Sequence, residues 1–214
     1  MAVIVPFRGI RYNSAKIKNL ADVITPPYDV ITAGEQEQLY RRSPYNFIRL
    51  EYGKTGPGDR SGENRYTRAA ASLKRWVDRG VLLREERPSF YLYRQSFNYL
   101  GSVYRRTGLI AALKLEPYDK KVILPHEDTL AAPKADRLEL LRSCRANFSP
   151  VFGLFTDGEQ RFAEICAPLL QKPPLYDFSD HRGERHVLWQ VDGVAAREAL
   201  RRLLEPRQIF IADG

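Results

Sequence analysis

The chain has 214 residues, with 34 Lys and Arg against 26 Asp and Glu, for a formal net charge of +8. Hydrophobic residues make up 43% and charged residues 28% of the sequence, which is typical of a folded globular protein and argues against disorder. No stretch reaches the roughly 18–20 consecutive apolar residues of a membrane-spanning helix. The apolar opening at 1–5 is too short for a signal-peptide core, so the sequence predicts a cytoplasmic protein without membrane partners.

The excess of positive charge occurs as short pairs, such as Arg41-Arg42 and Lys120-Lys121, and never as a run of five basic residues. A solvated surface explains this spacing best. Among possible partners, the positive charge is most compatible with a phosphate-bearing small molecule or nucleotide. Nucleic acid stays open as a less favoured partner, because no DNA-binding helix or RNA-binding sheet motif is present. The sequence does not indicate an oligomeric state.

The first elements predicted along the chain are a strand at 2–7 and a helix at 32–42. The helix starts with a capping box, in which Thr32 caps the backbone and Glu35 reaches back to it. Alternating apolar and polar residues predict a strand at 46–52. A longer helix is predicted at 64–79, and Gly80 is suited to end it.

Two long strands, 88–99 and 102–115, are predicted to form a hairpin, because aromatic residues alternate along the first strand and Gly101 can adopt a positive φ in the turn. A short strand at 122–124 follows. A helix is predicted at 134–145, with Pro133 at its first position.

In the last third of the chain, the sequence predicts three strands and two helices. The helix at 158–171 has one apolar face, as has the helix at 194–204. Because an Asp-Gly turn usually leads into further chain, we expect the chain to continue beyond Gly214. The predicted fold class is α+β: one domain over 1–214, with a mixed, largely antiparallel sheet and flanking helices. The three strands are predicted at 149–155, 185–191 and 208–212.

The densest group of chemically active side chains follows the strand at 122–124. His126 could move protons near neutral pH, and Glu127 or Asp128 could act as a general base. Lys134 and Arg137 lie one turn apart on the next helix and could hold phosphate oxygens. The alternative interpretation is a polar loop followed by a solvated helix face.

A second candidate is the stiff loop around Pro26-Pro27, which would hold Tyr28 and Asp29 in place for a ligand. A structural turn explains the same pattern, with Asp29 accepting from backbone amides. The segment around Asn147 is similar: polar residues stand where a strand is predicted to begin, and a structural turn is the default explanation.

Other signals are weaker. His181 and His186 lie five residues apart, but no second pair of ligands elsewhere favours a zinc site. Cys166 lies on an apolar helix face and is predicted to be a buried, inert thiol. Arg142 and Arg145 flank Cys144 and could lower the pKa of its thiol. The sequence has no nucleotide-binding loop of the Walker or dinucleotide type.

Several ordered motifs resemble one family, the bacterial and archaeal proteins grouped as domain of unknown function 1015. The resemblance covers essentially the whole chain. It is carried by the opening at 4–13, by 26–31, 43–46 and 64–66, by 124–127 with Thr129, by 133–134, 136–138 and 146–150, and by the ending at 211–214.

The resemblance implies the N-terminal part of a longer protein, in which His-His-Arg follows Gly214. Such a Gly-His-His-Arg box is similar to the phosphate-binding box of the ParB, sulfiredoxin and free serine kinase superfamily. Nucleotide binding by these 214 residues alone is therefore expected to be weak.

The resemblance further implies phosphoryl chemistry on a small hydroxy compound such as serine or phosphoserine, with ATP or ADP and magnesium as cofactors. A nucleotide-sensing or nucleic-acid-associated module without turnover is the alternative. Carried over to this chain, the resemblance implies catalytic roles for Asp29, His126 and Glu127, and phosphate or substrate contacts from Tyr28, Lys134, Arg137, Asn147 and Gly214. Asp128 would be the metal ligand.

Overall fold

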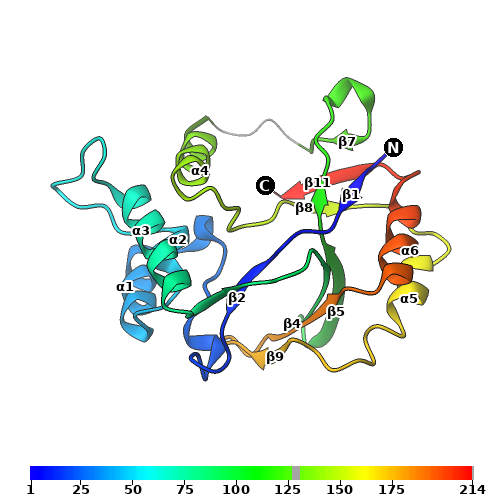
Figure 1. The fold of residues 1–214 in the computed structure, drawn as a ribbon, viewed down its shortest axis with the longest axis horizontal. Helices are drawn as coiled ribbons and strands as arrows, with labels where there is room; N and C mark the ends of the chain where they lie inside the picture. Colours follow the sequence, from blue (N-terminus) through cyan, green and yellow to red (C-terminus); the bar gives the residue numbers. More distant parts are fainter. Residues whose placement is uncertain (127–130, 214) are drawn as a thin grey trace. The chain divides into compact units, whose positions relative to one another are not determined.

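The structure is a computed structural model that describes residues 1–126 and 131–213. By its internal contacts the chain divides into two compact units (Figure 1). Unit 1 consists of Met1–Gly9, Glu85–Asp128 and Val151–Gly214. Unit 2 consists of Ile10–Arg84 and Thr129–Pro150. Each unit has a hydrophobic core of its own.

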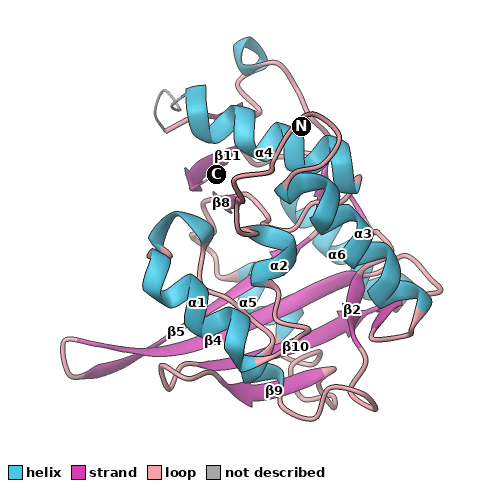
Figure 2. Cartoon of the chain, turned by 90° about the vertical axis from the view of Figure 1, so that its left-hand side faces the viewer, coloured by secondary structure: helices cyan, strands magenta, loops and turns pink. Residues whose placement is uncertain are grey.

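Unit 1 is built on a four-stranded antiparallel sheet with the order β5-β4-β10-β9, which Figure 2 shows. Its long hairpin turns at Leu100 and Gly101, whose φ angles are +49° and +79°. Two successive positive φ angles are typical of the two-residue turn that matches strand twist, so the predicted hairpin is confirmed. The strands are β4 (Phe90–Tyr99), β5 (Ser102–Ile110), β9 (Tyr176–Ser179) and β10 (Arg185–Val191).

Two helices of unit 1, α5 (Arg161–Cys166) and α6 (Val194–Leu204), contribute to the same hydrophobic core as this sheet. Leu200 of α6 is fully buried, and it shares the core with Leu92 of β4 and Trp189 of β10. The apolar faces predicted for the two helices therefore face the core.

Short strands complete unit 1. A three-stranded sheet has the order β7-β11-β8, and in β11 Ile209 packs against the core whereas Phe210 is exposed, as alternation along a strand requires. A two-stranded sheet pairs β1 with β6. The elements are β1 (Ile4–Val5), β6 (Ala112–Leu113), the 3-10 helix η3 (Tyr118–Lys120), β7 (Ile123–Leu124), β8 (Phe152–Leu154) and β11 (Ile209–Asp213).

Unit 2 is mainly helical, with one two-stranded sheet that pairs β2 with β3. Its larger core includes Leu50 and Trp76, and a smaller one surrounds Ile48. Helices α3 and α4 pack against each other, as do α2 and α3. The elements are β2 (Ile10–Tyr12), the 3-10 helices η1 (Leu20–Asp22) and η2 (Tyr28–Val30), α1 (Ala33–Arg42), α2 (Ile48–Glu51), α3 (Arg65–Asp78), β3 (Leu82–Arg84) and α4 (Ala131–Cys144).

Side chains cap the N-terminal ends of α1 and α3 in unit 2. Thr32 and Glu35 form the predicted capping box of α1, and Asn64 and Thr67 form a second one at α3. Gly80 follows α3 with a φ of +64°, as expected for a residue that ends a helix.

Some predicted elements are wrong. The segment at 46–52 is not a strand: Asn46 is buried, accepts from the backbone of Ile48 and donates to the carbonyls of Asp22 and Ile24, and this turn starts α2. The helix predicted at 158–171 is limited to α5, and α4 begins at Ala131, so that Pro133 is its third residue. Prediction missed β2, β3 and β9.

The α+β class with antiparallel sheets and flanking helices is confirmed. None of the helices among residues 1–126 and 131–213 is both long and apolar enough to cross a bilayer.

Candidate functional site

The most unusual side chain of unit 2 is the carboxylate of Glu51, the last residue of α2, which is only 3% exposed. Its Oε1 accepts hydrogen bonds from Arg137 Nη1 at 2.8 Å and from Ser149 Oγ at 2.6 Å. Its Oε2 is buried and has no hydrogen-bond partner among the described residues. A buried carboxylate oxygen without a donor is rare in folded proteins, and a catalytic role is one explanation for it.

A second carboxylate, Asp136 of α4, joins the same network. It accepts from the Tyr66 hydroxyl at 2.7 Å and from Arg137 Nε at 2.9 Å, and it forms an ion pair with Arg65. Asp136 and Arg137 are adjacent on α4, whereas Arg65 and Tyr66 begin α3. The network therefore fastens α4 to α3 and to the end of α2.

The guanidinium of Arg137 lies at the centre of the network. All three of its nitrogens donate, since Nη2 binds the Glu51 carbonyl at 3.1 Å and also binds Asp136. Its guanidinium carbon lies 3.9 Å from the centre of the Tyr28 ring, a cation–π contact. Arg137 is thus held on one face by an aromatic ring and at its edges by two carboxylates. We call Tyr28, Glu51, Arg65, Tyr66, Asp136, Arg137 and Ser149 the Glu51 network.

The two carboxylates differ in their proton affinity. Burial raises the pKa of Glu51, and the hydrogen bonds from Ser149 and Arg137 offset this only in part. Burial also acts to raise the pKa of Asp136, but hydrogen bonds from Tyr66 and Arg137 outweigh it and hold that pKa below its usual value. Glu51 is therefore the more readily protonated of the pair.

The thiol of Cys144 does not have the lowered pKa that its sequence neighbours suggested. Burial, followed by the negative charge of Glu51, raises the pKa of Cys144 to about 11. Burial also raises the pKa of Cys166 to about 11, as expected for an inert core thiol. Neither thiol is poised as a nucleophile.

Of the residues predicted to form a site, the structure brings Tyr28 and Arg137 into contact. Lys134 is exposed on α4, and Asp29 and Asn147 are exposed elsewhere in unit 2. His126 is an exposed residue of unit 1. Glu127, Asp128 and Gly214 lie outside the described residues.

Sequence reasoning about sites missed Glu51 and Ser149 as functional candidates. Glu51 stood in a segment predicted to be a strand, where a charged residue is expected to face solvent. Ser149, which precedes Pro150, was interpreted as part of a structural turn. A signal was present, since the motifs at 64–66 and 133–138 supply four other residues of the network, but nothing local linked them to Glu51.

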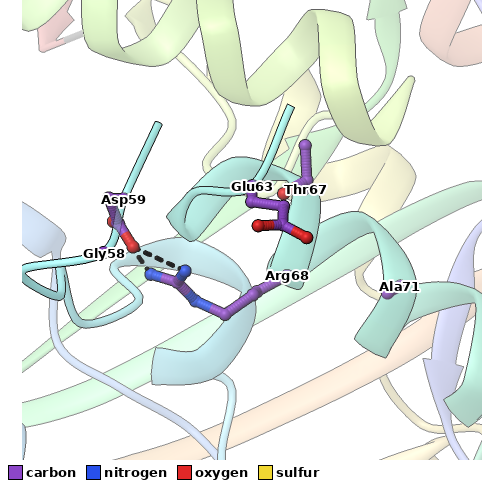
Figure 3. A pocket seen from close by; sticks show the side chains of 6 residues that line it. All are labelled: Gly58, Asp59, Glu63, Thr67, Arg68 and Ala71. Carbon is purple, nitrogen blue, oxygen red and sulfur yellow. Dashed lines mark hydrogen bonds and ion pairs between the residues drawn. The ribbon is translucent and has the colours of Figure 1, made fainter. Parts of the chain in front are cut away.

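A shallow hollow of about 510 Å³ also lies in unit 2 (Figure 3). Its one guanidinium, Arg68, binds both carboxylate oxygens of Asp59, at 2.7 and 3.0 Å, and the Lys54 carbonyl at 2.8 Å. The cation is therefore already paired. The hollow is lined by Gly58, Asp59, Glu63, Thr67, Arg68 and Ala71.

The Glu51 network does not fit a magnesium ion. Glu51 Oε1 and Asp136 Oδ2 accept from Arg137, and Asp136 Oδ1 is paired with Arg65, so three of the four carboxylate oxygens already face a cation. Within the described parts of the chain, the one group of three His, Cys, Asp or Glu ligands lies in unit 1. The charge of Arg137 thus occupies the place that a bound cation would need.

Residues 4–214 match the family described as "Protein of unknown function (DUF1015)". The chain belongs to this family. No curated protein and no solved structure matches the chain. The DUF1015 membership confirms the family resemblance, whereas the implied likeness to the ParB and sulfiredoxin superfamily stays a prediction.

Proposed function

We propose that this DUF1015 chain takes part in phosphoryl transfer between a nucleotide or phosphoester and a small hydroxy compound such as serine or phosphoserine. Glu51 would be the proton acceptor. The observation that carries the proposal is a buried carboxylate with a raised pKa, whose Oε2 has no donor among the described residues and whose Oε1 is bonded to the hydroxyl of Ser149, an exposed residue. Enzymes tune glutamates in this direction for general acid–base work.

We infer that a substrate reaches this group through Ser149, because Ser149 is an exposed residue whereas the Glu51 side chain and its Oε2 are buried. A hydroxy substrate that binds against Ser149 can pass its proton to Ser149 Oγ, while the Ser149 proton moves to Glu51. The substrate oxygen then forms the new bond to phosphorus. The bond from phosphorus to the donor oxygen breaks, and its electron pair leaves with the donor.

Phosphoryl transfer depends mainly on alignment and charge. Arg137 is a positioning residue, since its nitrogens are bound to Glu51 and Asp136 and hold the base in one orientation. Lys134 lies one turn before it on α4 and is exposed. We assign the Lys134 ammonium to the substrate phosphate, which replaces the predicted role of Arg137.

The proposal is tested by measuring transfer with serine or phosphoserine and a panel of ATP, ADP and other nucleotides, with and without magnesium. Glu51→Gln should lower kcat by about 10²–10⁴-fold, the usual contribution of a general base, with KM little changed. Ser149→Ala, at an exposed position, should lower kcat while the protein stays folded. The matched control is Glu139→Gln, an exposed carboxylate on α4, the helix that carries Arg137; Glu139 is paired with Arg142, and its substitution should not alter kcat.

Absence of turnover with every pair of substrates would overturn the proposal. If nucleotide nevertheless binds, the nucleotide-sensing alternative takes its place. Equal kcat values for the parent chain, Glu51→Gln and Ser149→Ala would remove Glu51 as the base.

A further inference from the structure

A second group of polar side chains lies in unit 1, at the turn between β9 and β10. Asp180 Oδ1 accepts from the backbone amides of Arg182 and Glu184, each at 2.9 Å. Gly183 has a φ of +80°, which completes the turn. The backbone amide of Asp180 also donates to the Glu184 carbonyl at 2.9 Å. These bonds fix the backbone from which two carboxylates, Asp180 and Glu184, extend.

His186 lies two residues after Glu184, on β10. Its ring stacks on Tyr93, with a centroid distance of 6.0 Å and an interplanar angle of 8°, and on Phe178 at 5.3 Å. Its side chain is only 13% exposed. The ring is therefore held between two aromatic side chains on neighbouring strands.

The two nitrogens of His186 have different surroundings. Nδ1 lies 2.6 Å from the Tyr93 hydroxyl, a hydrogen bond. Nε2 is buried and has no hydrogen-bond partner among the described residues. The carboxylate oxygen Asp180 Oδ2 lies 3.5 Å from Nε2, beyond the usual range of a hydrogen bond. A fixed imidazole thus presents an unpartnered nitrogen to two carboxylates.

We propose that Asp180, Glu184 and His186 bind a divalent transition-metal ion, most readily zinc. One ligand atom of each residue lies within 4.8 Å of the others. Ligands bound tetrahedrally at roughly 2.1 Å are about 3.4 Å apart, so His186 Nε2 and Asp180 Oδ2 are already at the required separation. Rotation of the flexible Glu184 side chain can bring its carboxylate oxygen to the same separation from these two atoms. One imidazole and two carboxylates form a donor set that suits zinc.

Tyr93 would be the outer partner that orients the imidazole. When His186 Nδ1 carries the proton and donates it to the Tyr93 oxygen, Nε2 keeps the lone pair that a metal needs. The Tyr93 hydroxyl oxygen has lone pairs that can accept this bond. Gln95 similarly donates to Glu184 from β4. Metal-binding histidines and carboxylates are generally supported by such partners.

The sequence did not favour this site, because His181 and His186 have no second pair of ligands elsewhere. The structure shows that the ligands come from a single hairpin: the turn supplies Asp180 and Glu184, and the strand supplies His186. Three protein ligands leave a fourth position open for water or a substrate, the arrangement typical of a catalytic zinc site. The proposal does not rest on the Glu51 network, which belongs to unit 2.

The site is tested by titrating the metal-free chain with Zn²⁺ in a calorimeter and with Co²⁺ in an absorption spectrometer. We expect one tight site and the visible bands of tetrahedral Co²⁺. Asp180→Asn removes the charged ligand oxygen, while its amide oxygen can still accept from Arg182 and Glu184 and preserve the turn. It should weaken Zn²⁺ binding by more than the roughly 10- to 100-fold expected for Tyr93→Phe, the loss of an outer partner.

Two controls locate the binding. Asp177→Asn changes another carboxylate of the same sheet, one paired with Arg185, and should leave the affinity unchanged. His181→Gln removes the neighbouring exposed histidine and should also have no effect. Equal Zn²⁺ affinity of the parent chain and Asp180→Asn, or loss of binding in His181→Gln, would overturn the proposal. So would octahedral Co²⁺ bands that Tyr93→Phe does not alter.

Discussion

The two units each contain a titratable side chain with one buried atom that has no hydrogen-bond partner among the described residues, but the surroundings of the two atoms differ. In unit 2, Glu51 is joined to residues 86 and 98 positions away, and its charge is balanced by Arg137. In unit 1, His186 is grouped with carboxylates only two and six residues before it. The first group joins distant segments of the chain, whereas the second is made by one turn.

This difference bears on function. A carboxylate that is held by a guanidinium has a fixed orientation and a charged neighbour, which suits proton transfer and not metal binding. Carboxylates that face an imidazole nitrogen with a lone pair can bind a cation, because the lone pair and the negative charges add to one another. The same residue types therefore predict different chemistry in the two units.

The largest expected effect comes from removing the cation of the Glu51 network. Arg137→Met leaves the Glu51 carboxylate buried without its charged partner, and breaking such a pair should lower the free energy of unfolding by about 3 kcal/mol. Urea unfolding followed by circular dichroism measures this value. The control is Arg142→Met on the same helix, whose pair with Glu139 is exposed and should contribute less than about 0.5 kcal/mol.

Adding Glu51→Gln to Arg137→Met should recover part of the lost stability, because the uncompensated charge is removed. If Arg137→Met and Arg142→Met unfold at the same urea concentration, the Glu51 network does not stabilise unit 2 in solution.

A smaller effect should appear in the pH dependence of stability. Because the folded-state pKa of Glu51 is raised, the folded chain binds this proton more tightly than the unfolded chain. The contribution of Glu51 to stability is therefore greatest below the unfolded pKa and is lost as the pH rises through the folded pKa. Glu51→Gln should remove this slope, as measured by urea unfolding between mildly acidic and neutral pH.

Glu139→Gln is the control for the pH experiment and should keep the slope of the parent chain. Asp136 has a lowered pKa and contributes a slope of the opposite sign, so the difference between the parent chain and Glu51→Gln is the quantity to compare. A parent chain that gains stability relative to Glu51→Gln as the pH rises would contradict the assignment.

Local sequence patterns were sufficient for elements that are specified by neighbouring residues. The capping box of Thr32 and Glu35 set the start of α1, and Gly101 set the turn of the long hairpin. The strand prediction at 46–52 failed because the buried residues of this segment fit both the strand and the helix periodicity. Burial of Ile48 and Leu50 suggests a strand, and only the buried side chain of Asn46, bonded to carbonyls near η1, selects the helical turn.

The candidate site was harder to predict for a related reason. The burial of Glu51 is possible only because Arg137 and Ser149 reach it from a distant part of the chain, and no local pattern records this contact. The metal ligands are local, but their grouping depends on the turn at 180–184, and β9 was not predicted. A site on an unrecognised hairpin cannot be assembled from the spacing of its histidines alone.

The helix starts of the two units offer a further comparison. Asn64 accepts from the backbone amides of Tyr66 and Thr67, at 3.0 and 3.1 Å, so α3 of unit 2 is capped by a side chain. Asn64→Ala should lower the free energy of unfolding by about 1 kcal/mol. Ser72→Ala, inside the same helix, should have little effect or stabilise slightly, because alanine favours helix. Urea unfolding compares the two variants, and equal stability would show that the cap contributes nothing.

The smallest expected effect is a gain of stability in unit 1. Helix α6 begins after Gly193, which has extended backbone angles, makes no side-chain cap and has open space where a Cβ would lie. Gly193→Ser supplies a capping hydroxyl and reduces the freedom of the unfolded chain, so the free energy of unfolding should rise by about 0.5 kcal/mol. The same substitution at Gly101 should have the opposite sign, because a φ of +79° strains any residue with a side chain. Thermal melting of the two variants measures both shifts, and a lower midpoint for Gly193→Ser would mean that α6 does not begin at this residue in solution.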